Sequence, residues 1–299
     1  MLATPAQPPR AGLPSNMPNG IVVIDKPADW TSMDVCAKLR GIFKERRVGH
    51  GGTLDPMATG VLPVFVGSAT KAVEFAEKGD KEYLAGLRLG LVTNTQDTTG
   101  ETLETRPVTA GRAELEAVLP RFTGPIEQVP PMFSAIKIKG QKLYELARKG
   151  QEVERKPRPV TIHALEVLEQ AGGGDYLLRV RCSKGTYVRT LCHDIGQALG
   201  CGGCMSSLRR TMAAGFTLEQ AVTIEQVQEQ GEALLLLAGR SAYRIASPRL
   251  ERLCRNGNPM PAGALASGEY RVYGQDGTFL CLSRWENGQL VPIKNFFGG

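Results

Sequence analysis

Asp55 is the residue whose surroundings in the sequence point most directly to chemistry. It lies in a glycine-rich loop over residues 49–60, in which the only titratable side chains are His50 and Asp55 itself. Pro56 biases Asp55 toward extended backbone geometry, and the glycines let another backbone come close, which suits a carboxylate presented at a cleft. The same residues also fit an Asx-type turn that only shapes the chain. Residue types alone leave both interpretations open.

The glycine-rich loop does not fit two familiar nucleotide-binding patterns. No Lys-Ser or Lys-Thr pair follows it to close a phosphate-binding loop. Gly49, Gly51 and Gly52 lack the spacing of a dinucleotide site. The loop is therefore not explained by nucleotide phosphates.

A zinc site is the second chemistry that the sequence raises. Cys192, His193, Cys201 and Cys204 lie within a short span. Structural zinc usually draws on two separated pairs of ligands, whereas Cys192 and His193 are adjacent on a predicted helix and point in different directions. His193-Asp194 also resembles metal-dependent phosphohydrolases, but a chain with three histidines cannot assemble a multi-histidine centre. The sequence favours neither metal site.

The composition is that of a folded protein with a modest basic excess. The chain has 299 residues, of which 42% are hydrophobic and 22% charged, and a net charge of +6 that favours a polyanionic partner. No apolar run approaches the ~18 residues needed to cross a bilayer. The proline-rich residues 1–19 lack the apolar core of a signal peptide, so we predict a disordered tail. Seven cysteines, an odd number, favour reduced thiols in the cytoplasm.

Apolar periodicity predicts the elements that must position Asp55. We predict strands at Gly20–Ile24, Leu62–Val66, Tyr83–Leu89, Val160–Leu168 and Tyr176–Cys182, and helices that start near Thr31 and cover Arg112–Phe122 and Tyr187–Leu199. This irregular, strand-rich order favours an α/β (α+β) fold with a mixed, largely antiparallel sheet. We assign residues 20–243 to this domain.

Two regions differ in residue composition from the rest of the chain. Pro130–Pro159 is rich in Lys and Arg and is bounded by prolines, which indicates an excursion from the core. Beyond a boundary near Tyr243–Pro248, short strand-like runs alternate with Gly and Asn turns. We predict a small β-barrel over residues 244–299.

Several motifs, in the same order along the chain, resemble the TruB family of tRNA pseudouridine synthases. The resemblance covers roughly residues 20–216. The catalytic signature is matched by Gly49-His50, Leu54-Asp55-Pro56, Ala58-Thr59-Gly60 and Gly67-Ser68-Ala69-Thr70-Lys71. The other motifs are matched by Asp25-Lys26-Pro27, Trp30-Thr31-Ser32, Lys81-Glu82-Tyr83, Gln128-Val129-Pro130-Pro131, Ser134-Ala135 with Lys137, Ser183-Lys184-Gly185-Thr186-Tyr187-Val188-Arg189 and Leu208-Arg209-Arg210. For the C-terminal residues the family implies an RNA-binding domain of the PUA type.

The resemblance implies a cofactor-free and metal-free enzyme that converts uridine to pseudouridine at position 55 in the T arm of tRNA. Asp55 would attack C1′ of the flipped uridine or assist loss of the base as a glycal, and the base would rejoin through C5. Arg189 would keep Asp55 ionised through an ion pair that lowers the carboxyl pKa.

Four further residues acquire roles from the resemblance. Tyr83 would stack on the extruded uracil, and Leu208 would form an apolar wall of its pocket. The hydroxyl of Tyr187 would serve proton removal from C5. His50 would fill the space that the base leaves, which aids flipping.

The basic segment resembles the mobile thumb of the family. Its candidate RNA-binding residues are Lys137, Lys139, Lys142 and Arg148, although a solvated charged surface would contain the same residue types. The implied partner is the T stem-loop of tRNA. The protein would bind it as a monomer, and no membrane would take part. The alternative is an RNA-binding or RNA-folding protein without turnover. The catalytic set described above speaks against it, because a pure binder requires no such set.

Overall fold

The larger of the two main sheets positions the Asp55 loop. The computed structural model describes residues 18–138, 140–236 and 241–295. This sheet has nine strands in the order β1, β3, β12, β4, β11, β10, β7, with β2 paired to β3 and β13 to β12. The strands are β1 (Gly20–Lys26), β2 (Val48–His50), β3 (Thr59–Val66), β4 (Lys81–Leu89), β7 (Gly124–Gln128), β10 (Arg158–Gly172), β11 (Asp175–Cys182), β12 (Gly203–Ala213) and β13 (Phe216–Thr217). Among the described strands of this sheet only β3 and β12 pair in parallel, so the predicted mixed, largely antiparallel sheet is confirmed.

The central strand β12 is absent from the sequence prediction. Two register shifts interrupt its pairing with β4, between Met205 and Ser207 and between Arg210 and Met212. Each bulge reverses which residues face the core, so no continuous alternation of apolar and polar residues marks the strand in the sequence.

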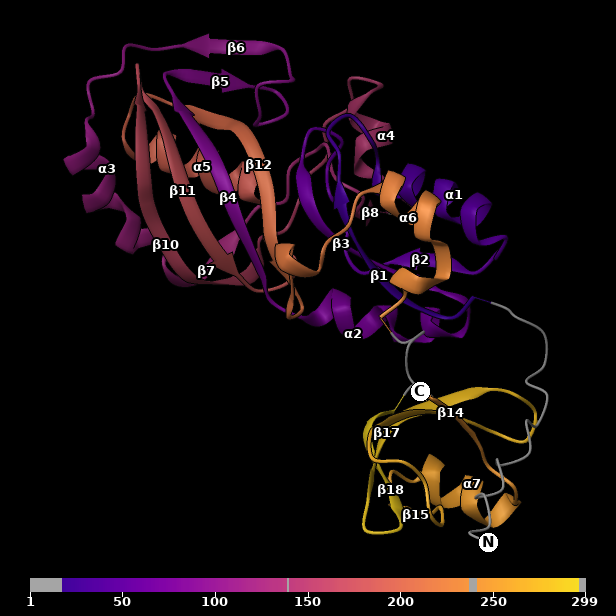
Figure 1. The fold of residues 1–299 in the computed structure, drawn as a ribbon. Coiled ribbons are helices and arrows are strands. Elements are labelled where there is room, and N and C mark those ends of the chain that lie inside the picture. The colour runs from indigo at the N-terminus through magenta and orange to yellow at the C-terminus, as the bar shows by residue number, and fades with distance from the viewer. Residues whose placement is uncertain (1–17, 139, 237–240, 296–299) are drawn as a thin grey trace, which may run out of the picture.

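Helices cover the sheet in two groups, as Figure 1 shows. Thr31 caps α1 (Ser32–Phe43) and exchanges hydrogen bonds with Asp34, as expected for a helix that starts here. The helix α6 (Ile224–Gln230) lies beside α1, while α5 (Val188–Ala198) packs on β12 and touches α3 (Arg112–Val118). The remaining elements of this domain are η1 (Gly67–Ala72), α2 (Val73–Lys78), η2 (Leu119–Phe122), η3 (Leu218–Gln220), η4 (Gly231–Leu234) and the hairpin of β5 (Leu91–Thr93) and β6 (Thr102–Thr105).

The basic segment is a small excursion from the sheet between β7 and β10. It contains β8 (Lys137–Ile138), β9 (Gln141–Lys142) and α4 (Leu143–Ala147). The two leucines of α4, Leu143 and Leu146, are buried and anchor the segment. We call residues 129–157 the thumb.

The C-terminal residues form a separate small sheet, curled like half a barrel, as expected for a PUA-like domain. Its strand order is β14 (Ser241–Arg244), β16 (Glu269–Tyr273), β17 (Phe279–Glu286), β18 (Gln289–Asn295) and β15 (Met260–Pro261), with α7 (Pro248–Arg255) beside it. The predicted boundary at residue 244 falls inside this sheet, at the end of β14. Phe279 of β17 packs with Ala69, Ala72 and Ala76 of the large domain.

Candidate active site

The Asp55 loop joins β2 to β3, and helix α1 holds it on one side. The N–H of Leu54 donates to the Ser32 hydroxyl at 2.9 Å, and that hydroxyl donates back to the Leu54 carbonyl at 3.2 Å. Both residues are almost fully buried. The residue before Asp55 is therefore pinned to the first turn of α1.

Lys26, fully buried at the end of β1, holds the residue after Asp55. Its ammonium donates to the carbonyl of Pro56 at 3.1 Å and to the carbonyls of Pro27 and Trp30. The N–H of Asp29 donates to the same Pro56 carbonyl at 2.9 Å. Burial lowers the pKa of the Lys26 ammonium to about 8.

Arg210, also fully buried, fixes the loop from the side of β12. Its guanidinium donates to the carbonyls of Val61 at 2.7 Å, Gly52 at 3.0 Å and Thr53 at 3.4 Å. The parallel pairing of β3 and β12 requires Gly60, because a Cβ there would stand 2.2 Å from the Arg210 carbonyl oxygen. The Ala58 N–H donates to the Asp55 carbonyl. With this bond included, a hydrogen bond reaches every carbonyl from residue 52 to residue 56.

Arg189, in the first turn of α5, contacts Asp55 directly. Its Nε lies 2.9 Å from Asp55 Oδ2, and its Nη2 lies 3.4 Å from Oδ1. The Arg189 side chain is 7% exposed, whereas 36% of the Asp55 side chain remains accessible. The two side chains form the two-point ion pair that the sequence analysis predicts, with one face of the carboxylate open.

Asp97 is part of this ion-pair network, and the sequence analysis does not single it out. Its Oδ2 lies 3.6 Å from Arg189 Nη1, and its Oδ1 accepts from the Thr95 hydroxyl at 2.8 Å and the Thr99 N–H at 3.0 Å. Asp97 is 4% exposed. In the sequence it stands in a polar, turn-like run of Asn and Thr, and only the fold shows that this loop is packed on β12.

The pKa of the Asp55 carboxyl is raised overall. Burial is the largest effect and raises the pKa, and the neighbouring Asp97 adds to it. Arg189 lowers the pKa as expected but does not outweigh burial. The ionised carboxylate is thus a higher-energy and more basic group than an aspartate in water.

Tyr83 and Leu208 come from the adjacent strands β4 and β12. Each is 8% exposed and belongs to the main core. Burial raises the pKa of the Tyr83 phenol, which also interacts with Arg210 and feels the charge of Asp55. The strand pairing places Arg210 opposite Tyr83 and Leu208 opposite Ala85. Tyr83 therefore lies beside Arg210, which holds the Asp55 loop, and Leu208 stands two residues before Arg210 on the same strand.

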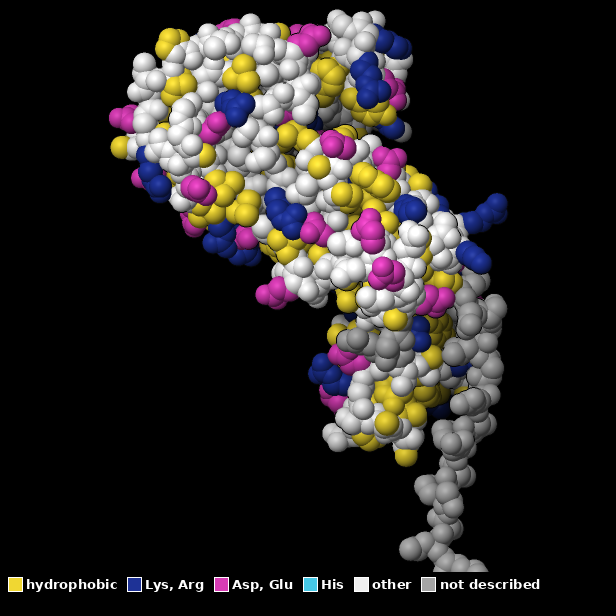
Figure 2. Space-filling model, turned by 45° about the horizontal axis from the view of Figure 1, so that its top comes forward, with side chains coloured by type: hydrophobic (Ala, Val, Ile, Leu, Met, Phe, Trp, Pro, Cys, Tyr) yellow, Lys and Arg dark blue, Asp and Glu magenta, His cyan; other side chains and the backbone are white. Residues whose placement is uncertain are grey.

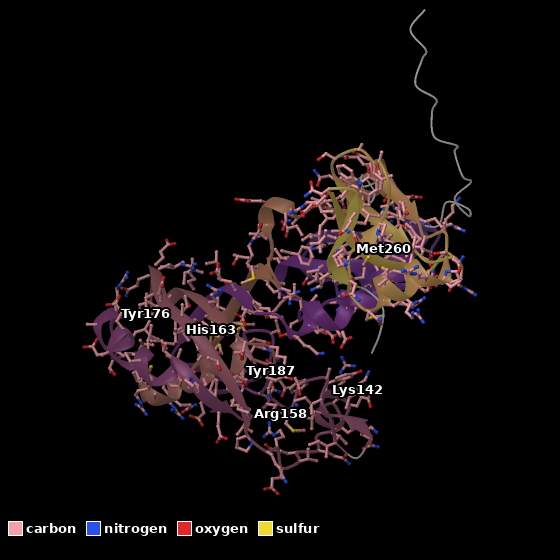
Figure 3. The ribbon with its side chains drawn as sticks, turned by 90° about the horizontal axis from the view of Figure 1, so that it is seen from below. Lys142, Arg158, His163, Tyr176, Tyr187 and Met260 are labelled. Atoms are coloured by element: carbon pink, nitrogen blue, oxygen red, sulfur yellow. The ribbon has the colours of Figure 1, made fainter. Side chains whose placement is uncertain are left out.

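Tyr187 is half-buried directly before α5, two residues from Arg189. Burial raises the pKa of its phenol, and Ser134, Arg158 and Arg189 oppose that effect. In Figure 3, Tyr187, Arg158 and Lys142 lie in one part of the molecule. The phenol thus lies near both the Asp55 carboxylate and Ser134 of the thumb.

His50 ends β2 and is a neutral imidazole at pH 7. Burial and the nearby Arg210 lower the pKa of its ring. Its Nδ1 is shielded from solvent and has no hydrogen-bond partner among the described residues. A neutral, partly buried ring is suited to filling space rather than to pairing with phosphate.

The predicted RNA-binding residues of the thumb are only partly described. Lys142 and Arg148 lie over the ring of Tyr144, at 5.3 and 5.4 Å from its centroid. Lys137 is described by its backbone alone, in β8, and Lys139 lies outside the described residues. On the face in Figure 2, basic and acidic side chains are interspersed, so contacts with phosphate depend on individual groups rather than on one broad patch there.

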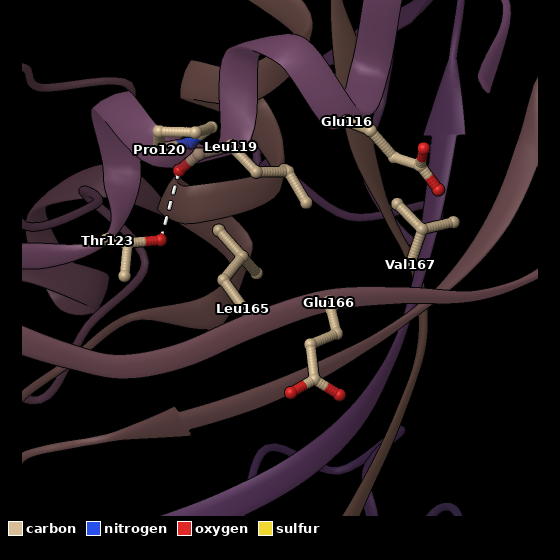
Figure 4. A pocket seen from close by; sticks show the side chains of 7 residues that line it. All are labelled: Glu116, Leu119, Pro120, Thr123, Leu165, Glu166 and Val167. Carbon is tan, nitrogen blue, oxygen red and sulfur yellow. Dashed lines mark hydrogen bonds between the residues drawn. The ribbon is translucent and has the colours of Figure 1, made fainter. Parts of the chain in front are cut away.

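Other features of the described chain offer no competing centre. No three of its His, Cys, Asp or Glu side chains are grouped to hold a metal ion, and none of its helices is long and apolar enough to cross a membrane. The pocket in Figure 4 lies between η2 and β10 and contains none of the predicted site residues. Its carboxylates, Glu116 and Glu166, would repel a nucleic acid.

Comparisons with known proteins show the family of the chain. Residues 40–188 match the sequence model described as TruB family pseudouridylate synthase (N terminal domain), and residues 189–235 match the tRNA pseudouridylate synthase B C-terminal domain. The tRNA pseudouridine synthase B of Cupriavidus metallidurans is 41% identical over 307 residues, which cover 96% of each chain. Its namesake from Pseudomonas putida strain GB-1 is 52% identical over 211 residues, or 71% of this chain and 69% of that protein.

The fold of the chain also resembles that of a solved structure. The chain superimposes on a protein of a Cbf5–Nop10–Gar1 complex with a TM-score of 0.63 and 25% sequence identity. The match covers 94% of this chain and 86% of that one. It extends beyond the residues matched by the two sequence models and so includes most of the C-terminal half-barrel.

Proposed function

Since the chain belongs to the TruB family of pseudouridylate synthases, we propose that it isomerises uridine to pseudouridine at position 55, in the T arm of tRNA. The shared name of its relatives gives the reaction and the class of RNA. The observation that carries the proposal is the Arg189–Asp55 ion pair on a loop with every carbonyl bonded from residue 52 to 56. A merely structural aspartate would not need one open face.

The reaction exchanges one bond at C1′ for another. The bond from C1′ to N1 of uracil breaks, the base rotates, and a bond from C1′ to C5 forms. The proton on C5 then leaves, and N1 gains a proton. Atoms and electrons balance without a redox step, so this chain's own residues suffice for the chemistry.

Asp55 has to be ionised in either proposed route. In one route it attacks C1′ as the bond to N1 breaks and forms an ester, which breaks again when C5 bonds to C1′. In the other it takes a proton from C2′ as the base departs and leaves a glycal, and it returns that proton to C2′ when C5 bonds to C1′. The raised pKa of the carboxyl makes the ionised form a better nucleophile and a better base. Arg189 favours the ionised form, and 36% of the Asp55 side chain stays accessible.

The remaining pocket residues would bind the extruded base. Chemistry at C1′ requires uridine to leave the stack of the T loop. Tyr83 would stack on the uracil, Leu208 would close an apolar side, and Tyr187 would receive or relay the C5 proton. His50, as a neutral ring, would fill the vacated space.

The thumb and the half-barrel would bind the RNA backbone. Lys142 and Arg148 carry charge at the thumb, where the aromatic ring of Tyr144 limits their freedom. We propose that the protein acts as a monomer in the cytoplasm. Light scattering of the complex with a T-arm stem-loop tests the stoichiometry, and a mass of two chains would contradict it.

The test of the proposed function is an assay on an unmodified T-arm stem-loop. We expect pseudouridine from the wild type only, at the target uridine only, and none with Asp55→Asn or with cytidine at the target position. Product at another uridine would contradict the T-arm assignment. Tight binding without product in the wild type would instead favour the RNA-folding alternative.

A further inference from the structure

Gln128 makes a two-point contact with the backbone of Tyr187. It is the last residue of β7, at the base of the thumb, and is 2% exposed. Its Oε1 accepts from the Tyr187 N–H at 3.0 Å, and its Nε2 donates to the Tyr187 carbonyl at 3.2 Å. Tyr187 precedes α5 without a side-chain cap, so one buried amide bonds both backbone polar groups of this residue.

The next residues of the thumb lie beside two other groups of the site. The carbonyl of Phe133 accepts from Arg189 Nη2 at 2.9 Å, beside the bonds of Arg189 to Asp55. Ser134 is 5% exposed, and its hydroxyl has no hydrogen-bond partner in the described part of the chain. It is one of the groups that oppose the rise in the pKa of the Tyr187 phenol.

The same segment is connected to the outer part of the thumb. The Ser134 carbonyl accepts from the N–H of Tyr144 at 3.1 Å. The charged groups of Lys142 and Arg148 lie over the ring of Tyr144. A set of contacts thus links Lys142 and Arg148 of the thumb to the Arg189 guanidinium, through Tyr144, Ser134 and the neighbouring Phe133.

We propose that Gln128 is a positioning residue for the isomerisation: it fixes the backbone of Tyr187 and, through that backbone, the position of the phenol. The inference rests on the proposed function and adds a role for a segment that the catalytic scheme leaves unused. Proton removal from C5 requires the phenol oxygen within hydrogen-bond reach of that carbon's proton. A phenol displaced by about 1 Å would lose on the order of 10²-fold in rate.

Substitutions at Gln128 test this positioning role. Gln128→Ala removes both bonds. Gln128→Glu keeps the shape and the acceptor for the Tyr187 N–H, but its ionised carboxylate faces the Tyr187 carbonyl and repels it. We expect the single-turnover rate to fall about 10- to 100-fold in both variants at pH 8, with stem-loop affinity within about threefold of wild type.

The pH dependence of Gln128→Glu separates positioning from general damage. Burial and the facing carbonyl raise the pKa of the introduced carboxyl, and its protonated form regains a donor. We expect the ratio of wild-type to variant rate to shrink as pH falls from 8 to 6 for Gln128→Glu. The ratio should stay constant for Gln128→Ala, which introduces no titratable group.

Gln170→Glu is a control for the same substitution outside the site. Gln170 of β10 donates to the Tyr176 phenol of β11 at 3.2 Å. We expect Gln170→Glu to keep the wild-type rate at pH 8 and at pH 6.

The results separate this inference from the proposed function. A wild type that forms no pseudouridine overturns the proposed function, whatever the variants do. A wild type that forms product, with Gln128→Ala at the same rate or with a pH-independent ratio for Gln128→Glu, overturns the positioning role alone. Rates that fall only in step with melting temperature also overturn it.

Discussion

The Asp55 loop and the thumb are both long connections out of the same sheet, and they are held in different ways. In the Asp55 loop, buried groups of β1, α1 and β12 bond the carbonyls on either side of the carboxylate. In the thumb, hydrogen bonds join mainly its own residues, as between Leu143 and Ile136 and between Tyr144 and Ser134. The segment from Gln128 to Ser134 is where the two regions meet.

This difference assigns different physical tasks to the two loops. A reacting carboxylate gains from a fixed position, because rate falls steeply with misplacement. Contacts with a phosphate backbone are electrostatic and tolerate changes in geometry. The comparison teaches that substitutions in the first loop should change the rate or the stability, and substitutions in the second the affinity.

Asp55→Asn is the most damaging substitution for the rate. We expect single turnover to fall by at least about 10³-fold, as when the reacting group of an enzyme is removed. Because folding raises the pKa of this carboxyl, the stability linked to it is full at acid pH and is lost as pH rises through the raised pKa. At pH 7 the neutral amide should therefore melt at the same temperature as the wild type or higher. A clear drop in melting temperature, measured by calorimetry, would make Asp55 a structural residue.

Asp97→Asn is a second test of the Asp55 loop and its ion-pair network. The substitution removes a negative charge that raises the pKa of Asp55. It also removes a carboxylate oxygen that pairs with Arg189, so the Arg189 side chain is held less firmly. We expect a rate loss of about 10- to 100-fold. The rate should decline at acid pH in both proteins, since the ionised carboxylate is required, but at a lower pH in the variant. A pH profile of single turnover measures the shift, and an unchanged or opposite shift would contradict the network.

Lys26→Met tests how far the Asp55 loop depends on buried donors. The substitution leaves the carbonyls of Pro27, Trp30 and Pro56 without this ammonium. We expect a loss of about 2–4 kcal/mol in the free energy of unfolding, by analogy with other broken buried polar contacts. Urea denaturation measures it. Stability equal to wild type would show that the loop is held by its other contacts alone.

Lys142→Ala and Arg148→Ala should have the smallest effects. Each removes one charge from the thumb, so we expect stem-loop affinity to fall about three- to tenfold and the salt dependence of binding to weaken by about one charge. The rate at saturating RNA should stay near wild type. Titrations at several salt concentrations measure the effect, and a large rate loss at saturation would break the division between the two loops.

Most of the fold followed from local patterns. The cap of α1 at Thr31 and the strands that became β1, β3, β4, β10 and β11 were readable from residue types and periodicity. The central strand β12 was not, since its bulges interrupt the alternation. The half-barrel was recognised from its turns, but its first strand, β14, was not, because it pairs in parallel with a distant partner.

The site was accessible from the sequence only in part. Asp55 stood out as a lone carboxylate, and the family motifs carried Arg189, Tyr83, Tyr187 and Leu208. Asp97 could not be distinguished from a solvated turn residue, because its burial depends on contacts with β12 more than 100 residues away. The sign of the Asp55 pKa shift was also beyond the sequence, since it depends on how burial and Arg189 balance.

The parallel pair of β3 and β12 also dictates when the site can exist during synthesis. Thr59 and Gly60 pair with Arg209 and Arg210. Ribosomes make the chain from its N-terminus, so the Asp55 loop is complete long before the strand that braces it has emerged. Until then Thr59 and Gly60, at the start of β3, lack their pairing partners on β12. The Asp55 site is thus among the last parts of the large domain to assemble.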